Sequence, residues 1–275
     1  MKTIHTLKKV SLATFLTFVL SFSSVFAQND TMYIMKSGAI VGQYNVNTEV
    51  DSVIFYKPTI EETTSGTFID SRDGNEYNWV QIGDQVWMAE NLAYLPSVNM
   101  VADGSEDAAG SYYYVYGYDG TNVADAKATD NYATYGVLYN WTAAMDGEAS
   151  STTNPSGIQG VCPAGWHVPS DAEWTELTDY LGGTGAGGKL KETGTTHWAS
   201  PNTDATNETG FTALPGGYRY FSGNFSLIGN YGYWWSATEN STSNAWYRYM
   251  NYYGSSVNRI DTSKEDGFSV RCVRD

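Results

Sequence analysis

Two cysteines in an exported chain place the strongest constraint on how this sequence can fold. The N-terminus has the three parts of a secretory signal: a lysine-bearing start, an apolar run over residues 10–22, and the small or branched residues of a cleavage site before Gln28. The only cysteines are Cys162 and Cys272, and cysteines of exported proteins are expected to pair. We therefore predict a signal peptide over residues 1–27 and a Cys162–Cys272 disulfide.

The predicted disulfide joins a helix start to the end of the chain. Cys162 lies shortly before the helix-start pattern of residues 170–173, whereas Cys272 lies in a short apolar strand pattern that closes the sequence. In the chain-entropy model, closing a loop of about 100 residues stabilises a fold by about 4–5 kcal/mol. We expect the two cysteines to mark the two ends of one domain.

The charge of the mature chain argues against two classes of partner. Signal cleavage would remove three lysines and no acid, which leaves 12 of the 15 basic side chains against 30 acidic ones, a formal charge of −18. Nucleic acids and anionic membrane surfaces bind basic patches, so neither is expected as a partner. No later segment has about 18 consecutive apolar residues, so we expect no membrane insertion after cleavage. The protein is predicted to be exported: periplasmic, cell-surface or secreted.

The mature chain divides into three parts. Residues 28–57 form a short N-terminal β unit, with strand patterns at residues 32–35 and 51–56. Residues 58–66 are polar and aperiodic, which is typical of a linker. The main domain follows over residues 67–275.

The main domain is predicted to be α+β. Residues 77–89 indicate a β-hairpin with a Gly83-Asp84 turn, residues 103–132 a long loop, and residues 135–145 a helix. Ser170 and Glu173 form a capping-box pattern that begins a second helix. From Gly210 onward, strand patterns alternate with Gly, Asn and Ser turns. We expect antiparallel strands, two main helices and long loops.

Several ordered blocks resemble the Fibrobacter succinogenes major paralogous domain, which occurs in exported proteins of Bacteroidetes and Fibrobacteres. They include residues 86–92, 135–145, 162–174, 210–219, 233–239 and 270–273, within a match over about residues 67–275. The resemblance implies no activity.

A more distant likeness is to the formylglycine-generating, sulfatase-modifying enzymes, and through them to the C-type-lectin-like fold. It rests on residues 168–174 and on Gly267-Phe268 with Arg271-Cys272. Those enzymes need a pair of thiols that bind copper, and here the two cysteines match structural positions. The catalytic thiol pair is absent, so we expect no enzyme of that type. His167 and His197 are interpreted as structural, because neither adjoins a recognisable nucleophile motif.

Aromatic side chains in the late strands are the strongest remaining functional signal. Consecutive aromatics in a strand cannot all face inward, because successive side chains alternate between faces. In lectins of the resembled fold, the ligand surface lies near these strands. The candidate ligand-binding residues are Tyr233, Trp235, Glu239, Asn240, Tyr247, Arg248 and Tyr249. The alternative is that long loops simply cover the rings.

No cofactor is required by the sequence, but calcium is a candidate. Calcium needs six to eight oxygen ligands, which acidic loops can supply. The candidate ligands are Asp119, Asp125, Asp130, Glu239 and Asn240. The sequence lacks the motifs of calcium-dependent sugar-binding lectins and of EF-hands.

These observations favour an exported, non-enzymatic binding module. A glycan or polysaccharide is the first candidate ligand, bound through exposed aromatic rings. A surface or matrix protein is the alternative partner, and an enzyme of unknown chemistry on the same fold is the third hypothesis.

Overall fold

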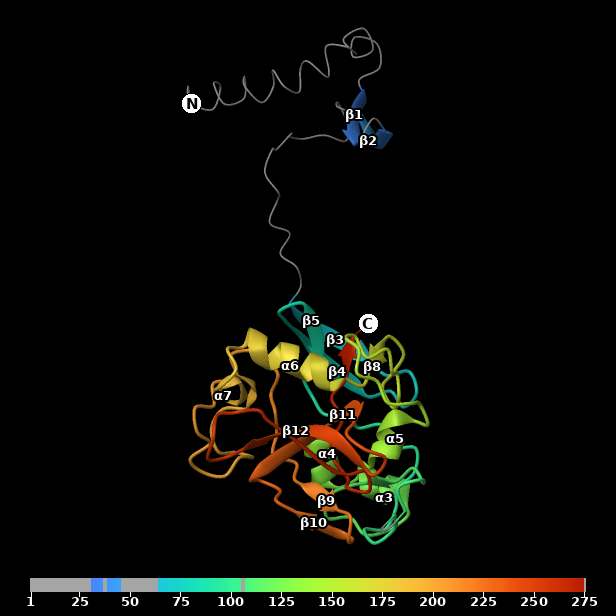
Figure 1. Cartoon of the computed structure of the whole chain (residues 1–275), viewed down its shortest axis with the longest axis vertical. Coiled ribbons are helices and arrows are strands. Elements are labelled where there is room, and N and C mark those ends of the chain that lie inside the picture. Colours follow the sequence, from blue (N-terminus) through green and yellow to red (C-terminus); the bar gives the residue numbers. More distant parts are fainter. Residues whose placement is uncertain (1–30, 37–38, 46–63, 105–106, 275) are drawn as a thin grey trace. The chain divides into compact units, whose positions relative to one another are not determined.

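The computed structural model describes residues 31–36, 39–45, 64–104 and 107–274 (Figure 1). The chain divides into two compact units, Met1–Glu61 and Glu62–Asp275. The predicted signal peptide and the second N-terminal strand, residues 51–56, lie outside the described residues, as does most of the predicted linker. No helix within the described ranges is long and apolar enough to span a bilayer.

In the first unit, a single antiparallel hairpin is described. Strand β1 (Thr31–Lys36) contains the strand predicted at residues 32–35. Its partner is β2 (Ala39–Asn45), which the sequence analysis missed because Gly42 and Gln43 interrupt the apolar pattern.

A five-stranded sheet begins the second unit, with the spatial order β3-β4-β5-β14-β8. Its strands are β3 (Ser65–Ile69), β4 (Glu76–Ile82), β5 (Gln85–Met88), β14 (Val273–Arg274) and β8 (Trp166–His167). The predicted β4–β5 hairpin is confirmed, and its turn holds Gly83 at φ +64°. Strand β3 starts inside the predicted linker, because an edge strand of mostly polar residues carries no clear apolar alternation.

Helix α6 (Asp171–Tyr180) is the longest helix described and has the predicted capping box. The Ser170 side chain accepts from the Glu173 amide at 3.1 Å, and the Glu173 carboxylate accepts from the Ser170 amide at 2.8 Å. Its buried face carries Trp174 and Leu177. Figure 1 shows α6 beside the strands of the five-stranded sheet, where Gln85 donates to the Glu173 carbonyl at 3.0 Å.

The prediction of a single helix over residues 135–145 is wrong. Helix α4 (Asp130–Tyr135) ends at Gly136, whose φ of +74° stops a helix, and the short strand β7 (Leu138–Tyr139) follows. Helix α5 (Trp141–Met145) then starts afresh at Asn140, whose side chain accepts from the Ala143 amide.

The predicted long loop over residues 103–132 is also more structured than expected. It contains β6 (Tyr113–Tyr114), paired with β7, and helix α3 (Val123–Lys127). Helix α7 (Ala186–Leu190) is also short. Each described helix other than α6 is one to two turns long.

The late strands form a three-stranded antiparallel sheet with the order β11-β12-β13. Its strands are β11 (Tyr231–Glu239), β12 (Asn244–Asn251) and β13 (Asn258–Ser263), and a separate hairpin joins β9 (Tyr218–Tyr220) to β10 (Asn224–Ser226). The closing strand predicted around Cys272, over residues 268–273, is largely extended chain, and only Val273–Arg274 belong to a strand. Only isolated bridges hold its first half, at Phe268 and Ser269.

The hydrophobic core lies on both faces of β11. Trp234 packs with Trp87 and Trp174 in one buried cluster, whereas Trp235 packs with Phe268 and the disulfide in the other. This division follows from the strand alternation of adjacent side chains. The second unit is thus a mixed α+β domain of several antiparallel sheets and short helices.

Candidate ligand-binding surfaces

The predicted disulfide is present, and it orders the end of the chain. Cys162 and Cys272 are bonded, with their Cα atoms 6.0 Å apart, and both are fully buried. The Cys272 carbonyl accepts from the Met88 amide at 3.0 Å, and the Val270 carbonyl accepts from the Leu92 amide at 2.9 Å. The last residues are therefore fixed against the segment that follows β5.

A cluster of aromatic rings covers one face of the late strands, and all of them except the buried Tyr233 are partly or largely exposed. We call it the tyrosine surface and define it as Tyr218, Tyr220, Tyr231, Tyr233, Tyr247, Tyr249 and Tyr253. The register explains its contiguity, because Tyr233 lies opposite Tyr249 in the β11–β12 pair. Rings two residues apart on a strand share a face, so Tyr231 and Tyr247 join the same face.

The rings of the tyrosine surface contact one another in series. Tyr231 stacks on Tyr233 with centroids 5.7 Å apart, and Tyr233 lies 5.0 Å from Tyr218. The hydroxyls of Tyr231 and Tyr253 are 2.8 Å apart. That hydrogen bond is the main reason why the pKa of Tyr231 is raised to about 12. The rings thus support one another at the surface.

The outer rings are open to solvent. Tyr253 is 56% exposed and Tyr220 is 39% exposed, and Ile260 on the neighbouring strand β13 is 46% exposed. Tyr247 and Tyr249 are half-buried. Rings with one face free and polar neighbours are able to stack on a sugar or to pack against a protein.

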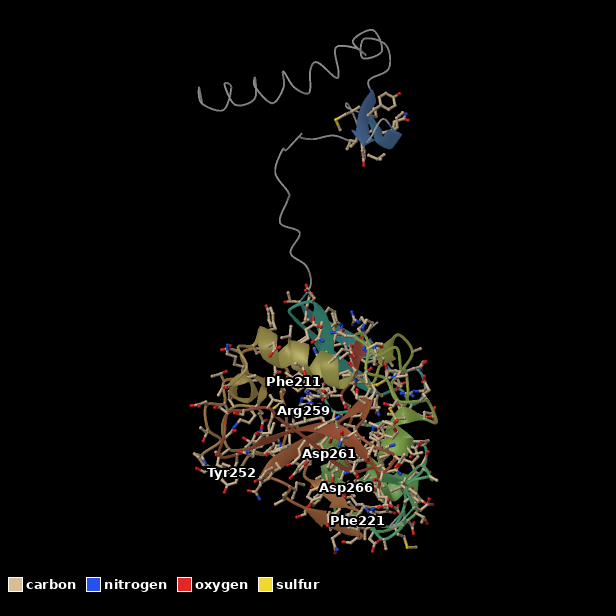
Figure 2. The ribbon with its side chains drawn as sticks, viewed as in Figure 1. Phe211, Phe221, Tyr252, Arg259, Asp261 and Asp266 are labelled. Carbon is tan, nitrogen blue, oxygen red and sulfur yellow. A yellow bond between two sulfur atoms is a disulfide. The ribbon has the colours of Figure 1, made fainter. Side chains whose placement is uncertain are left out.

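A buried acid lies beneath the same surface. Asp266 accepts from the Phe221 amide at 2.7 Å and from the Thr262 hydroxyl at 2.7 Å. Burial raises the pKa of Asp266 to about 6. Figure 2 labels Asp266 and Phe221, which lie near one another below Asp261.

Three of the predicted ligand-binding residues point inward. Trp235 is 0% exposed and donates to the Tyr139 carbonyl at 2.8 Å, and Tyr233 is buried against Phe268. Arg248 lies on the opposite face, where it pairs with Asp171 at 2.6 Å. The expectation of a surface ring at Trp235 is therefore corrected. The segment around Phe268 covers this part of the sheet. Strand alternation alone cannot predict this cover, because it comes from a different part of the chain.

The remaining predicted residues lie apart from the rings. Glu239 pairs with Lys264 at 2.7 Å, and the Asn240 amide donates to the Asn244 carbonyl at 2.9 Å.

The other acidic calcium candidates belong to separate segments. Asp119 accepts from the Val101 amide at 3.0 Å. Asp125 and Asp130 lie in the first turns of α3 and α4. Within the described ranges, no group of three or more His, Cys, Asp or Glu side chains is placed to hold a metal ion.

Both mature histidines contact a glutamate. His167 Nε2 lies 2.6 Å from the Glu173 carboxylate, and both residues are buried beside the capping box of α6. His197 Nδ1 lies 2.9 Å from the Glu192 carboxylate and is partly exposed. Each imidazole is therefore held by a carboxylate.

A second candidate site, missed by the sequence analysis, surrounds Glu90. Two neighbouring pockets, of about 270 and 320 Å³, share Ala89, Glu90 and Thr212 as lining residues. We call them the Glu90 pockets. Glu90 accepts from both the backbone and the side-chain nitrogens of Asn78, at 2.8 and 2.5 Å. Thr212 has φ +53°, which is rare for a β-branched residue.

The walls of the Glu90 pockets are tied together by a buried arginine. The Arg271 guanidinium donates to the Ala89 carbonyl at 3.2 Å on one wall, and to the Phe211 carbonyl on the other. Burial lowers the pKa of Arg271 to about 9, and Glu90 opposes that shift. Because Cys272 is the next residue, the disulfide holds Arg271 in place.

A family model for the Fibrobacter succinogenes major domain matches residues 80–274, which is most of the second unit. The chain belongs to this family. No curated protein and no solved structure matches the chain.

Several of the sequence blocks on which the resemblance rests meet at the Glu90 pockets. Glu90 comes from the block at residues 86–92, Gly136 from the block at residues 135–145, and Thr212 from the block at residues 210–219. Arg271 belongs to the closing block. The sequence could therefore have pointed to this site through polar residues within these blocks, such as Glu90. No chemical motif distinguished those residues from their neighbours.

Proposed function

We propose that this Fibrobacter succinogenes major domain protein is an exported, non-enzymatic binding module that recognises a glycan or polysaccharide through the tyrosine surface. The single observation that carries the proposal is the contiguous run of rings that ends in the exposed Tyr220 and Tyr253. Sugar rings pack their C–H faces on such aromatic groups, and polar neighbours then bind the hydroxyls.

The surroundings of the tyrosine surface support this function. Asn224 and Asn258 lie on strands that border the rings, and Asn258 lies opposite Tyr249 in the β12–β13 pair. The fold is proposed to be C-type-lectin-like, with the ligand surface near the late strands. The absence of a thiol pair beyond the disulfide Cys162–Cys272 argues against the chemistry of formylglycine-generating enzymes.

A surface or matrix protein is the second candidate partner. Ile260 extends the exposed rings with an aliphatic side chain, and contiguous exposed apolar groups often mark protein interfaces. A protein interface of standard size would bury about 800 Å² on each partner, more than a few sugar units would cover.

The test is a binding screen of the mature chain, residues 28–275, against a glycan and polysaccharide panel, with calcium and with a chelator. Binding should be lost in Tyr253→Ala and Tyr220→Ala. It should persist in Tyr180→Ala, because Tyr180 is 65% exposed but lies on α6. Loss on chelation would show that binding depends on a divalent cation. No binding to any glycan in either condition would overturn the glycan proposal and favour a protein partner.

A further inference from the structure

We propose that the Glu90 pockets form a second binding site, which takes an extended basic peptide segment with Lys or Arg at alternate positions. This proposal does not depend on the tyrosine surface. It rests on the charge, the floor and the spacing of the acids in the two pockets.

The charge of the lining residues favours a cation. Among the described residues that line the two pockets, Glu76 and Glu90 are the ionisable acids, and no Lys, Arg or His is present. The buried Arg271 behind the wall offsets one negative charge, but it is bonded to backbone carbonyls and to Asn91. Two cations lie near lining residues without lining the pockets themselves: Lys127 pairs with Asp73 at 3.8 Å, and Arg274 lies over the Trp79 ring. The charged side chains that line the pockets are therefore both acidic.

The floor favours a peptide over a sugar. Ser65 and Thr67 of β3 lie opposite Val80 and Asn78 of β4, and together they present small and polar groups. The Trp79 ring lies on the other face, over Gly66 and 4.3 Å from the Arg274 guanidinium. An open aromatic ring for stacking on a pyranose is thus lacking at this floor, whereas amide and hydroxyl groups suit a peptide backbone.

The spacing of the acids matches an extended chain. Glu90 is fixed on Asn78 by two hydrogen bonds, and Glu76 lies two residues before Asn78 on the same strand and the same face. Two residues along a strand span about 7 Å. Side chains at alternate positions of an extended peptide have the same separation, so two cationic heads can face Glu76 and Glu90 together.

The site is also rigid before any ligand binds. Arg271 joins its two walls, and the disulfide at Cys272 anchors Arg271. Thr212, which both pockets share, is held at its strained φ by hydrogen bonds with Asn207 at 2.8 and 3.0 Å. Backbone strain of this kind often occurs at binding sites, and a rigid site loses less entropy on binding.

The test is calorimetric titration of the mature chain with a blocked pentapeptide that alternates lysine and serine. We expect a dissociation constant on the order of 0.1–1 mM, and weakening of about 3- to 10-fold in Glu90→Gln and in Glu76→Gln. The matched control is Asp84→Asn, which removes one exposed acid at the β4–β5 turn, outside both pockets. That variant should bind as the wild type does.

Two further ligands make the test specific. A peptide of the same charge with its three lysines consecutive should bind more weakly, because only alternate lysines match the acids. A glucosamine tetramer tests an amino sugar in place of the peptide.

The proposal is overturned if neither peptide binds, if Asp84→Asn weakens binding as much as Glu76→Gln does, or if the tetramer binds more tightly than the alternating peptide. Glu76 is exposed on β4, so Glu76→Gln keeps the test valid if Glu90→Gln misfolds. Tyr253→Ala should leave peptide binding unchanged, which separates this site from the tyrosine surface.

Discussion

Arg271 donates to the side-chain oxygen of Asn91 at 2.8 Å, and both residues are buried between two walls of the domain. The same Asn91 oxygen accepts from the Trp234 indole at 2.8 Å. One amide oxygen therefore connects the last residues of the chain, the segment after β5 and strand β11. Arg271 and its partners stabilise one another, because removal of the guanidinium or of its acceptors leaves buried polar groups without hydrogen bonds.

Substitution of Arg271 should destabilise the domain more than any exposed arginine would. Arg271→Met leaves the carbonyls of Ala89 and Phe211 without this donor and removes one of the two donors to the Asn91 oxygen, so we expect a loss of about 3–5 kcal/mol in the free energy of unfolding. Urea unfolding measures it. Arg274→Met is the control: Arg274 lies over Trp79 and Trp166 near the surface, and its loss should cost about 1 kcal/mol. Equal losses in the two variants would contradict this account.

Removal of the disulfide should lower stability through the unfolded state. The bonded cysteines are 110 residues apart, and a bridge of that span contributes up to about 4–5 kcal/mol in the chain-entropy model. The double variant Cys162→Ala, Cys272→Ala should lose this amount in denaturant titrations. Because both cysteines are fully buried, reductant alone should leave the native wild-type bridge intact, and reductant with denaturant should bring the wild type to the stability of the variant. Rapid reduction of the native protein would show that the bridge is accessible.

The sequence predicts the disulfide, the capped helix α6 and the β4–β5 hairpin correctly because their signals are local or admit a single solution. One pair of cysteines has one pairing, and Ser170 with Glu173 specifies a helix start by its own hydrogen bonds. The helix over residues 135–145 fails for the same physical reason. Gly136 and Asn140 interrupt it locally, and these signals are stronger than the apolar spacing that suggested a continuous helix.

The candidate sites could be predicted only in part, because they depend on contacts between distant segments of the chain. Strand alternation correctly predicts that consecutive aromatics of the late strands divide between two faces, as Trp234 and Trp235 do. It cannot tell that the segment at Phe268 covers Trp235 while Tyr253 stays open. The Glu90 pockets need contacts between residues more than a hundred positions apart, such as Ala89 with Arg271, and no local pattern contains that information.

Truncation of Trp235 should test folding and not ligand binding. Its ring is fully buried against Phe268, with centroids 4.4 Å apart, so Trp235→Ala should cost about 3–5 kcal/mol of stability. Thermal or urea unfolding measures the effect. The exposed Tyr253→Ala serves as the comparison and should change stability by less than about 1 kcal/mol. A Trp235→Ala protein as stable as the wild type would refute the buried placement of this ring.

Asp266 should make the protein less stable as the pH rises through about 6. Burial raises the pKa of Asp266 from 3.8 to about 6. Between these values the folded state keeps the proton and the unfolded state has released it, so each pH unit upward costs the folded state about 1.4 kcal/mol. Above pH 6 the penalty is complete, at up to about 3 kcal/mol. Below pH 4 both states are protonated and the penalty is absent.

The variant Asp266→Asn should remove this dependence. An asparagine can still accept from the Phe221 amide and can donate to the Thr262 oxygen, and it stays neutral at every pH. We expect the variant to be more stable than the wild type at pH 8 and to lose that advantage at pH 4, measured by urea unfolding at both values. Asp261→Asn is the matched control. A hydrogen bond from Asn244 lowers the pKa of Asp261, so its charge is constant between pH 5 and 8 and the variant should keep the wild-type slope over that range. An Asp266→Asn protein whose stability relative to wild type is the same at pH 4 and pH 8 would show that the Asp266 carboxyl titrates alike in the folded and unfolded states.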